Sequence, residues 1–207
     1  MRDGTAVRLE PHEIALLGEG PRAAVTVAVV ELHLRGLVGA NLPGTIRARV
    51  ADAVEGVEAV EPTSPLAAAV HGCLRAPAPP KALVKDPDIR LAVAVMRIPL
   101  AEAGLLRHPL LGATRAARRH VRELRHEHPL PARRQGLTDH ARLLLVALHG
   151  EAALRLLVPR FALRAGLVRR AEVGRPDLPT HAPRGTGGVG GGVYYCGGGG
   201  GGGSGGD

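Results

Sequence analysis

Three helical stretches of the chain end in the same way, with a glycine followed by two aliphatic residues. They are "LHLRGLV" at Gly36, "LAEAGLL" at Gly104 and "ALRAGLV" at Gly166. This pattern is typical of a helix C-terminus, because glycine adopts the left-handed backbone conformation there without strain. Another apolar helical stretch precedes each of them, in "EIALLGEG", "PLAAAVHGC" and "LLVALHGE". The pattern predicts three degenerate helix-turn-helix units, unless it recurs by chance in a chain rich in Ala, Leu and Gly.

The first unit begins with two helical patterns. Pro11 and Pro21 favour helix starts and predict helices at 11–18 and 21–35, because proline is well accepted in the first helical turn. Glu10, just before the first helix, suits the positive end of its dipole. The second helix is almost entirely apolar, so we expect it to be buried.

A β hairpin is predicted after the second helix. The segments "LVGA" and "TIRARV" flank the turn sequence "NLPG". In the second segment apolar and basic residues alternate, which gives a strand one buried and one exposed face. The apolar positions are Ile46, Ala48 and Val50, and the basic positions are Arg47 and Arg49. Two helices followed by a hairpin predict a reduced winged helix.

The rest of the chain is predicted to be helical up to its tail. The connector "APAPPKALVKDPD" interrupts the second unit, and Pro99 kinks or restarts its last helix. Further helices are predicted at 113–126 and 137–170, and the glycine-rich tail cannot bury apolar surface and is predicted to be disordered. The fold class is therefore mainly α: winged-helix-like units with one small β hairpin, extra C-terminal helices and a disordered tail. We divide the chain into a winged-helix-like unit (1–62), a second degenerate helical unit (63–112), a basic helical region (113–173) and the tail (174–207).

The composition limits which residue types form the core and which partners the chain can bind. The 207-residue chain is 45% hydrophobic but only 1% aromatic, so its core consists of Leu, Val and Ala. Such side chains pack between helices but make a poor base-stacking surface. The net charge of +8 is uneven, because residues 1–105 hold 11 Lys/Arg against 12 Asp/Glu and residues 106–184 hold 16 Arg against 6 Asp/Glu. A basic half favours nucleic acid or anionic lipid, although a preference for arginine is also typical of a GC-rich genome.

Many winged helices read DNA, but helix 21–35 lacks the side chains for it. Base readout in the major groove relies on Arg, Lys, Asn or Gln on the inserted helix. The polar stripe of this helix consists of Arg22, Thr26, Val29 and His33. On the wing, Arg47 and Arg49 are candidate phosphate contacts, which carry no sequence information. Packing of the helix against its neighbours is the better interpretation.

The helix in "TRAARRHVRELRHEHP" is the most charged part of the chain. Its arginines gather on about a third of the circumference, opposite a narrow apolar side. These candidate anion contacts are Arg115, Arg118, Arg119, Arg122 and Arg125. The face suits phosphates or an anionic membrane surface, but Glu123 and Glu127 also offer local partners. A merely solvated amphipathic helix is the alternative.

No constellation of residues indicates an enzyme. The two serines, Ser64 and Ser204, fall in a linker and in the tail, Cys73 lies in an apolar helix, and Cys196 has no base beside it. A phosphate-binding loop is not evident, because the tail glycines precede no Lys-Ser/Thr and no helix. Three histidines lie close in sequence but do not share a helix face, which disfavours a metal site: His120, His126 and His128. We predict no enzymatic activity, cofactor, metal or small-molecule substrate.

The cellular compartment is predicted from the lack of a recognisable signal peptide or membrane span in the sequence. The start "MRDGTAVRLE" has no apolar core of a signal peptide, and the runs "LAVAV" and "LLLVAL" fall short of the roughly 20 residues of a membrane span. Two widely separated cysteines indicate a reducing compartment. We expect a cytoplasmic protein, or one at the periphery of a membrane.

The stretches "HEIALLGEGPRAAVTVAVVELHLRGLV" and "SPLAAAVHGCL…IRLAVAVMRIPLAEAGLL" and the glycine-run tail with a cysteine resemble an uncharacterised actinobacterial family. Its members share a GGP-R-A-V helix junction, matched here from Gly18 to Ala23, and many are described as membrane proteins. The similarity spans about residues 9–172 and the tail composition. This chain differs in having no spanning segment and a single tail cysteine. The resemblance implies the architecture and a membrane association of some members, and no activity, catalytic residue or cofactor.

We therefore expect a non-enzymatic protein-interaction or scaffold module with an unknown protein partner. The alternative is a DNA-binding winged-helix regulator that uses the Arg-rich helix and the wing. Nucleic acid is the less favoured partner, because the helix in the reading position lacks base-contacting side chains.

Overall fold

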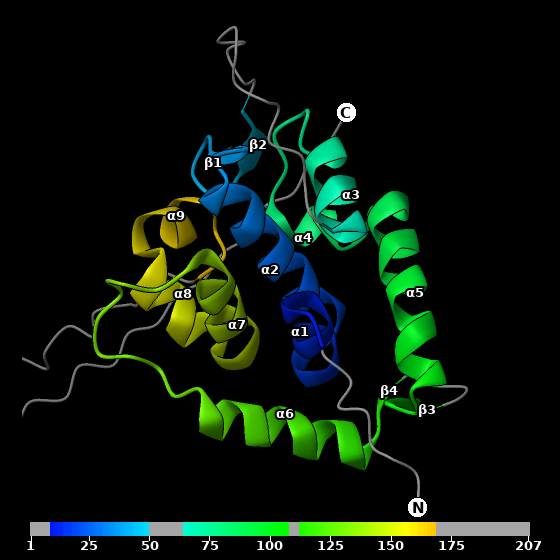
Figure 1. Cartoon of the computed structure of the whole chain (residues 1–207). Helices are drawn as coiled ribbons and strands as arrows, with labels where there is room; N and C mark the ends of the chain where they lie inside the picture. Colours follow the sequence, from blue (N-terminus) through cyan, green and yellow to red (C-terminus); the bar gives the residue numbers. More distant parts are fainter. Residues whose placement is uncertain (1–8, 50–63, 108–111, 169–207) are drawn as a thin grey trace, which may run out of the picture. The chain divides into compact units, whose positions relative to one another are not determined.

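The computed structural model describes residues 9–49, 64–107 and 112–168. In chain order its elements are α1 (Pro11–Glu19), α2 (Pro21–Leu34), β1 (Val38–Ala40), β2 (Ile46–Ala48), α3 (Pro65–Cys73), α4 (Pro80–Leu83), α5 (Pro87–Glu102), β3 (Leu106–Arg107), β4 (Gly112–Ala113), α6 (Arg115–Glu127), α7 (Asp139–His149), α8 (Glu151–Leu157) and α9 (Pro159–Arg164) (Figure 1). The expected mainly helical architecture with a small β hairpin is confirmed. The tail 174–207 lies outside the described residues.

Helix α2 is the centre of the described structure. It packs against α1, α3 and α7, and its residues from Ala24 to Leu32 are buried apart from the partly exposed Thr26 (Figure 1). An almost wholly apolar helix is stable only where neighbours cover it on all sides. The predicted burial of helix 21–35 is therefore confirmed, and α2 has no open face that could enter a DNA groove.

The three predicted helix ends share one backbone geometry. Gly36, Gly104 and Gly166 have φ of 78°, 70° and 71°. In each case the glycine N–H donates to the carbonyl three residues back, and the next N–H donates to the carbonyl five residues back. This pair of bonds is the Schellman motif, which only a residue with positive φ completes without strain. The three-fold recurrence read from the sequence is therefore also a recurrence of structure.

The hairpin is held on three sides. β1 and β2 pair antiparallel, with Val38 opposite Ala48. The outer edge of β2 pairs with the loop after α3, through two backbone hydrogen bonds of 2.9 Å between Ile46 and Ala78. At the turn, Gly44 N–H donates at 2.8 Å to the carbonyl of Arg164, the last residue of α9 in the second half of the chain. The hairpin is thus fixed against both halves of the described chain.

An aromatic stack joins α2 to α9. The rings of His33 on α2 and Phe161 on α9 lie 3.7 Å apart and nearly parallel, at 4°. Burial lowers the pKa of His33, the carbonyl of Val38 opposes this, and the charge of Arg49 adds to the lowering. The neutral ring is thereby favoured in the stack.

Two details depart from the predicted elements. The segment predicted to be helical at 137–170 contains three helices, α7, α8 and α9: the break at Gly150, which has a φ of 52°, agrees with the helix end indicated in "LLVALHGE", whereas the new helix that starts at Pro159 was not predicted. A second, shorter antiparallel pair, β3 and β4, follows the second Schellman motif. By contrast α5 continues through Pro99 without restarting. Helix α7 of the predicted basic region packs against α1 and α2, so the helical segments share one core.

Candidate functional site

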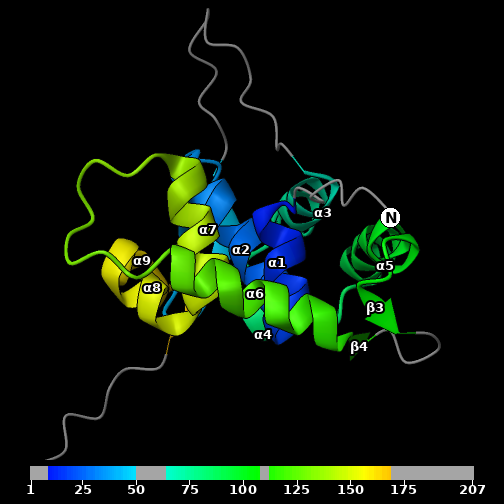
Figure 2. The ribbon, with the colours of Figure 1, turned by 60° about the horizontal axis from the view of Figure 1, so that its bottom comes forward.

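The arginine face of α6 points away from the core. Thr114 caps the helix by accepting a bond from Ala117 N–H, and Ala117 and Val121 are buried on the side that contacts α1 and α7. All five predicted arginines are exposed: Arg115, Arg118, Arg119, Arg122 and Arg125. Figure 2 shows α6 lying across the body as a single straight rod. The predicted amphipathic helix is thus present, with its narrow apolar side used for packing.

Only part of this arginine face is neutralised. Arg119 pairs with Glu123 at 2.8 Å, and Arg125 lies 3.8 Å from Glu19 on α1. For the other three arginines, no carboxylate of the described residues lies within ion-pair distance: Arg115, Arg118 and Arg122. Because only two of the five arginines have a carboxylate of the described residues beside them, the face keeps a net positive charge.

The wing arginines do not join this face. Arg47 and Arg49 are exposed as predicted, but β1 contacts α2 and α9, whereas α6 contacts α1 and α7 (Figure 1). The Arg49 side chain lies across Gly39, whose missing Cβ leaves it room. The structure therefore does not bring together the two predicted groups of anion contacts.

A cavity of about 850 Å³ lies among the described residues. Residues of five helices line it: the starts of α1, α3 and α7, the end of α2 and the middle of α5. Its volume falls within the range typical of small-molecule sites, about 300–1,000 Å³. The sequence had indicated no such site.

The deep end of the cavity carries a buried polar cluster. The Glu31 side chain on α2 is 2% exposed, and its Oε2 lies 2.9 Å from His12 Nε2 on α1. Ser64 Oγ donates to the same oxygen at 3.5 Å, and Arg35 Nε lies 3.7 Å from Oε1. His12 is 7% exposed, and its Nε2 has no hydrogen bond of acceptable geometry despite the short contact. The cluster therefore ties the starts of α1 and α3 to the end of α2.

The opposite wall of the cavity is apolar. It consists of α5 residues with three leucines from other helices: Ala92, Val95, Met96, Pro99, Leu34, Leu66 and Leu143. Near the mouth lie Glu10 and Glu13, which form a reciprocal capping box at the start of α1, and Asp139, which lies 3.2 Å from Arg142. The cavity thus joins an apolar wall to a carboxylate-rich one.

Helix α5 also has an apolar face on the outside. Ile89, Val93 and Leu100 are buried, and α5 packs against α3. On the opposite side Leu91, Val95 and Ile98 are 65%, 51% and 56% exposed, at the spacing of one helical stripe. We call these three residues the α5 stripe. Single exposed leucines are ordinary on protein surfaces, but a contiguous stripe is typical of an interaction site.

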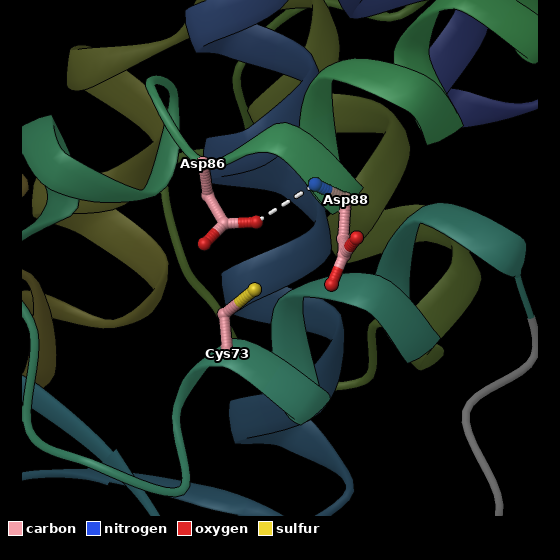
Figure 3. A group of neighbouring side chains, drawn as sticks. All are labelled: Cys73, Asp86 and Asp88. Carbon is pink, nitrogen blue, oxygen red and sulfur yellow. Dashed lines mark hydrogen bonds between the residues drawn. The ribbon is translucent and has the colours of Figure 1, made fainter.

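Cys73 forms a small cluster with two aspartates at the start of α5 (Figure 3). Asp86 caps α5 by accepting bonds from Asp88 N–H at 2.9 Å and Ile89 N–H at 3.4 Å. Burial, then the hydrogen bond and charge of Asp86, raise the pKa of the Cys73 thiol to about 12. The three possible ligand atoms lie within 4.8 Å of one another, but the thiol stays protonated at neutral pH and one carboxylate is used as a cap. The cluster is accounted for as a contact between α3 and α5.

The structure offers no metal geometry at the histidines considered above. His120, His126 and His128 are all exposed, and within the described ranges the one close group of metal-ligand types is that of Cys73. His149 Nε2 contacts the carbonyl of His128 at 2.7 Å, which joins α7 to the end of α6.

Comparison with protein-family models, curated proteins and solved structures finds no match to this chain. Among the helices in the described part of the chain, none has both the length and the apolar character of a membrane span.

Proposed function

We propose that the protein is a non-enzymatic interaction module that binds a partner protein through the α5 stripe. The observation that carries this proposal is the exposure of Leu91, Val95 and Ile98 in one line on a helix whose other side is buried. Covering such a stripe with an apolar helix removes its surface from water, worth about 25 cal/mol per Å². The occupant is therefore a partner helix with an apolar face.

A photo-crosslinking amino acid at Ile98 tests this in cells. We expect a discrete protein adduct, which Leu91→Glu abolishes because a charge in the stripe cannot be desolvated. Leu42→Glu is the matched control, since Leu42 on the hairpin turn is also 65% exposed but lies outside the stripe. The proposal fails if no adduct forms, or if both substitutions reduce it equally.

A nucleic-acid contact through α6 is the second candidate function. The observation that favours it is the exposed arginine face, in which Arg115, Arg118 and Arg122 have no carboxylate of the described residues within ion-pair distance. Such a contact is to phosphates, and the burial of α2 keeps that helix from base readout. It would accompany protein binding rather than replace it.

A gel-shift titration against salt separates this candidate from the first. The affinity for duplex DNA should fall steeply with salt, and Arg115→Gln, Arg118→Gln and Arg122→Gln together should flatten the log–log slope by about 3. Sequence preference would favour a regulator. An absence of binding at low salt would remove this candidate and leave the α5 proposal intact.

The remaining expectations stay predictions. We place the protein in the cytoplasm or at the periphery of a membrane, and we retain the proposed kinship with the actinobacterial family on the residues quoted above. The Schellman motifs and the buried α2 support the shared architecture that this kinship implies.

A further inference from the structure

The α5 stripe continues into the cavity beside it. Val95 belongs to the stripe and also lines the cavity, and Ala92 and Met96 of the same helix line it as well. Among the described elements α5 packs mainly against α3 and β3, and the exposure of Leu91 and Ile98 shows that its outer side is not covered by them. The stripe and the cavity wall of α5 therefore form one apolar surface, which we call the α5 groove. It consists of Leu91, Ala92, Val95, Met96, Ile98 and Pro99.

The spacing of the groove residues matches a docked helix. A helix bound in an apolar groove presents anchor side chains at i, i+3 or i+4 and i+7, and Leu91, Val95 and Ile98 offer the same spacing in return. Anchors at the centre of an interface fill pockets in the partner's surface. The cavity beside Val95 has a volume of about 850 Å³, so it can receive side chains of such a helix.

Carboxylates surround the α5 groove. Asp88 precedes Leu91 by three residues and Glu102 follows Ile98 by four, and these spacings place the two acids at the two ends of the stripe. Both acids are exposed. Three further carboxylates line the cavity mouth opposite α5: Glu10, Glu13 and Asp139.

The basic residues of α5 lie on the flank of the stripe away from the cavity. Ala92 follows Leu91 by one residue and lines the cavity, whereas Arg90 precedes Leu91 by one residue and lies about a quarter turn to the other side. Arg97 is seven residues after Arg90 and so shares its flank. Neither arginine lines the cavity. The cavity side of the α5 groove is therefore its acidic side.

Only part of the negative charge around the groove is neutralised. Arg142 lies 3.2 Å from Asp139, and Arg35 lies 3.7 Å from Glu31 inside the cavity. In the described part of the chain, no basic side chain lies within ion-pair distance of the remaining carboxylates: Glu10, Glu13, Asp88 and Glu102. The net charge of the whole chain is +8, so the potential at this groove is opposite in sign to that charge.

We propose that the α5 groove binds a cationic amphipathic helix: a partner segment whose apolar stripe covers the α5 stripe and whose Lys or Arg residues flank its own stripe. This inference rests on the proposed function, in which a partner helix covers the α5 stripe, and it adds the charge of that helix. Complementary charge at the rim of an interface speeds association and disfavours partners of the wrong sign. A helix with acidic flanks would be repelled by Glu13 and Glu102.

Fluorescence anisotropy with three labelled peptides tests the proposal. Each peptide has about 18 residues, or five helical turns, with leucines at i, i+3, i+4 and i+7, and its flanking positions are all Lys, all Gln or all Glu. The full chain carries substitutions that remove a competing site for the Glu peptide on α6: Arg115→Gln, Arg118→Gln and Arg122→Gln. The remaining net charge, 8 − 3 = +5, would by itself favour the Glu peptide.

We expect the opposite order of affinities. The Lys peptide should bind at least tenfold more tightly than the Glu peptide, with the Gln peptide between them, and rising salt should reduce this difference. Absence of Lys-peptide binding overturns the proposal, and so does a Glu peptide that binds as tightly as the Lys peptide.

Two double substitutions with the same change of charge locate the contact in that background. Glu13→Gln with Glu102→Gln removes two charges beside the groove, and glutamine keeps the role of Glu13 in the capping box of α1. The affinity for the Lys peptide should fall at least fivefold, and that for the Gln peptide should stay within twofold. Glu123→Gln with Glu127→Gln on α6 is the matched control and should leave both affinities unchanged, since neither residue lines the cavity. Equal effects of the two pairs would refute the location.

The same experiments separate this inference from the proposed function. An adduct at Ile98 in cells together with equal binding of the three peptides would leave the α5 stripe as a protein contact and overturn the cationic partner. Absence of both the adduct and Lys-peptide binding would overturn the two together.

Discussion

Replacing the glycines of the three Schellman motifs by alanine tests the recurrence most simply. At Gly36 and Gly104 an added Cβ would meet nothing within 4 Å, so the only cost is the positive φ itself. A left-handed conformation costs an L-residue about 1 kcal/mol or slightly more. We expect Gly36→Ala and Gly104→Ala each to lower the free energy of unfolding by about 1 kcal/mol.

The third motif adds a steric cost to the same backbone cost. The Cβ of Gly166→Ala would lie 3.0 Å from Gly44 Cα, a backbone atom of the hairpin turn. Relief requires the turn to move, which strains the 2.8 Å bond from Gly44 N–H to the carbonyl of Arg164. We expect a loss of about 2–3 kcal/mol, the sum of the backbone cost and one disturbed hydrogen bond.

Gly72 provides a control of opposite sign. It lies inside α3 with an ordinary helical φ, and an added Cβ would meet nothing within 4 Å. Gly72→Ala should raise the free energy of unfolding by about 0.5–1 kcal/mol, because alanine has the higher helix propensity. Urea unfolding followed by far-ultraviolet circular dichroism measures all four variants, since the chain has no tryptophan. The reasoning is refuted if Gly36→Ala and Gly104→Ala are neutral, or if Gly72→Ala destabilises as they do.

Three further predictions follow from the titrating groups. In a Cys196→Ser background, Cys73 should react with iodoacetamide at pH 8 at least tenfold more slowly than an exposed thiol, because its pKa of about 12 leaves little thiolate. The substitution Asp86→Asn removes a charge that raises this pKa and keeps a good helix cap, so it should speed the reaction. The hydrogen bond from Cys73 lowers the pKa of the Asp86 carboxyl. The ionised carboxylate therefore stabilises the fold fully above its ordinary pKa of 3.8, and acid unfolding should show this stabilisation being lost as the pH falls through the lowered pKa. The pKa of His33 is lowered mainly by burial, so the folded state disfavours its proton: stability should fall as pH drops below 6.5, and Arg49→Gln should raise this pKa in an NMR titration.

The sequence was informative where the determinants of structure are local. Each Schellman motif depends on one glycine and the helix before it, so "RGL" and "AGL" patterns suffice to predict three helix ends. The burial of α2 also follows locally, because a helix that is apolar on every side has to be covered. Pro159 is an equally local signal for a helix start, and it marks the division between α8 and α9 that was not predicted.

The cavity could not be predicted in the same way, because its walls come from five helices whose packing no single segment specifies. One signal was present: Glu31 is the only charged residue from Ala24 to Leu32, and a carboxylate in such a helix has to find partners. The identity of those partners, His12 and Ser64, depends on contacts across the fold. The pair β3–β4 is likewise too short to show a periodic pattern.

The central claim is that α2 forms the interior and that partners bind only at the outer helices. Native-state hydrogen exchange of the backbone amides tests it most directly. We predict that the amides from Ala24 to Leu32 exchange only through global unfolding, while those of α6 exchange faster through local opening. Exchange of the α2 amides as fast as that of α6 would contradict the account.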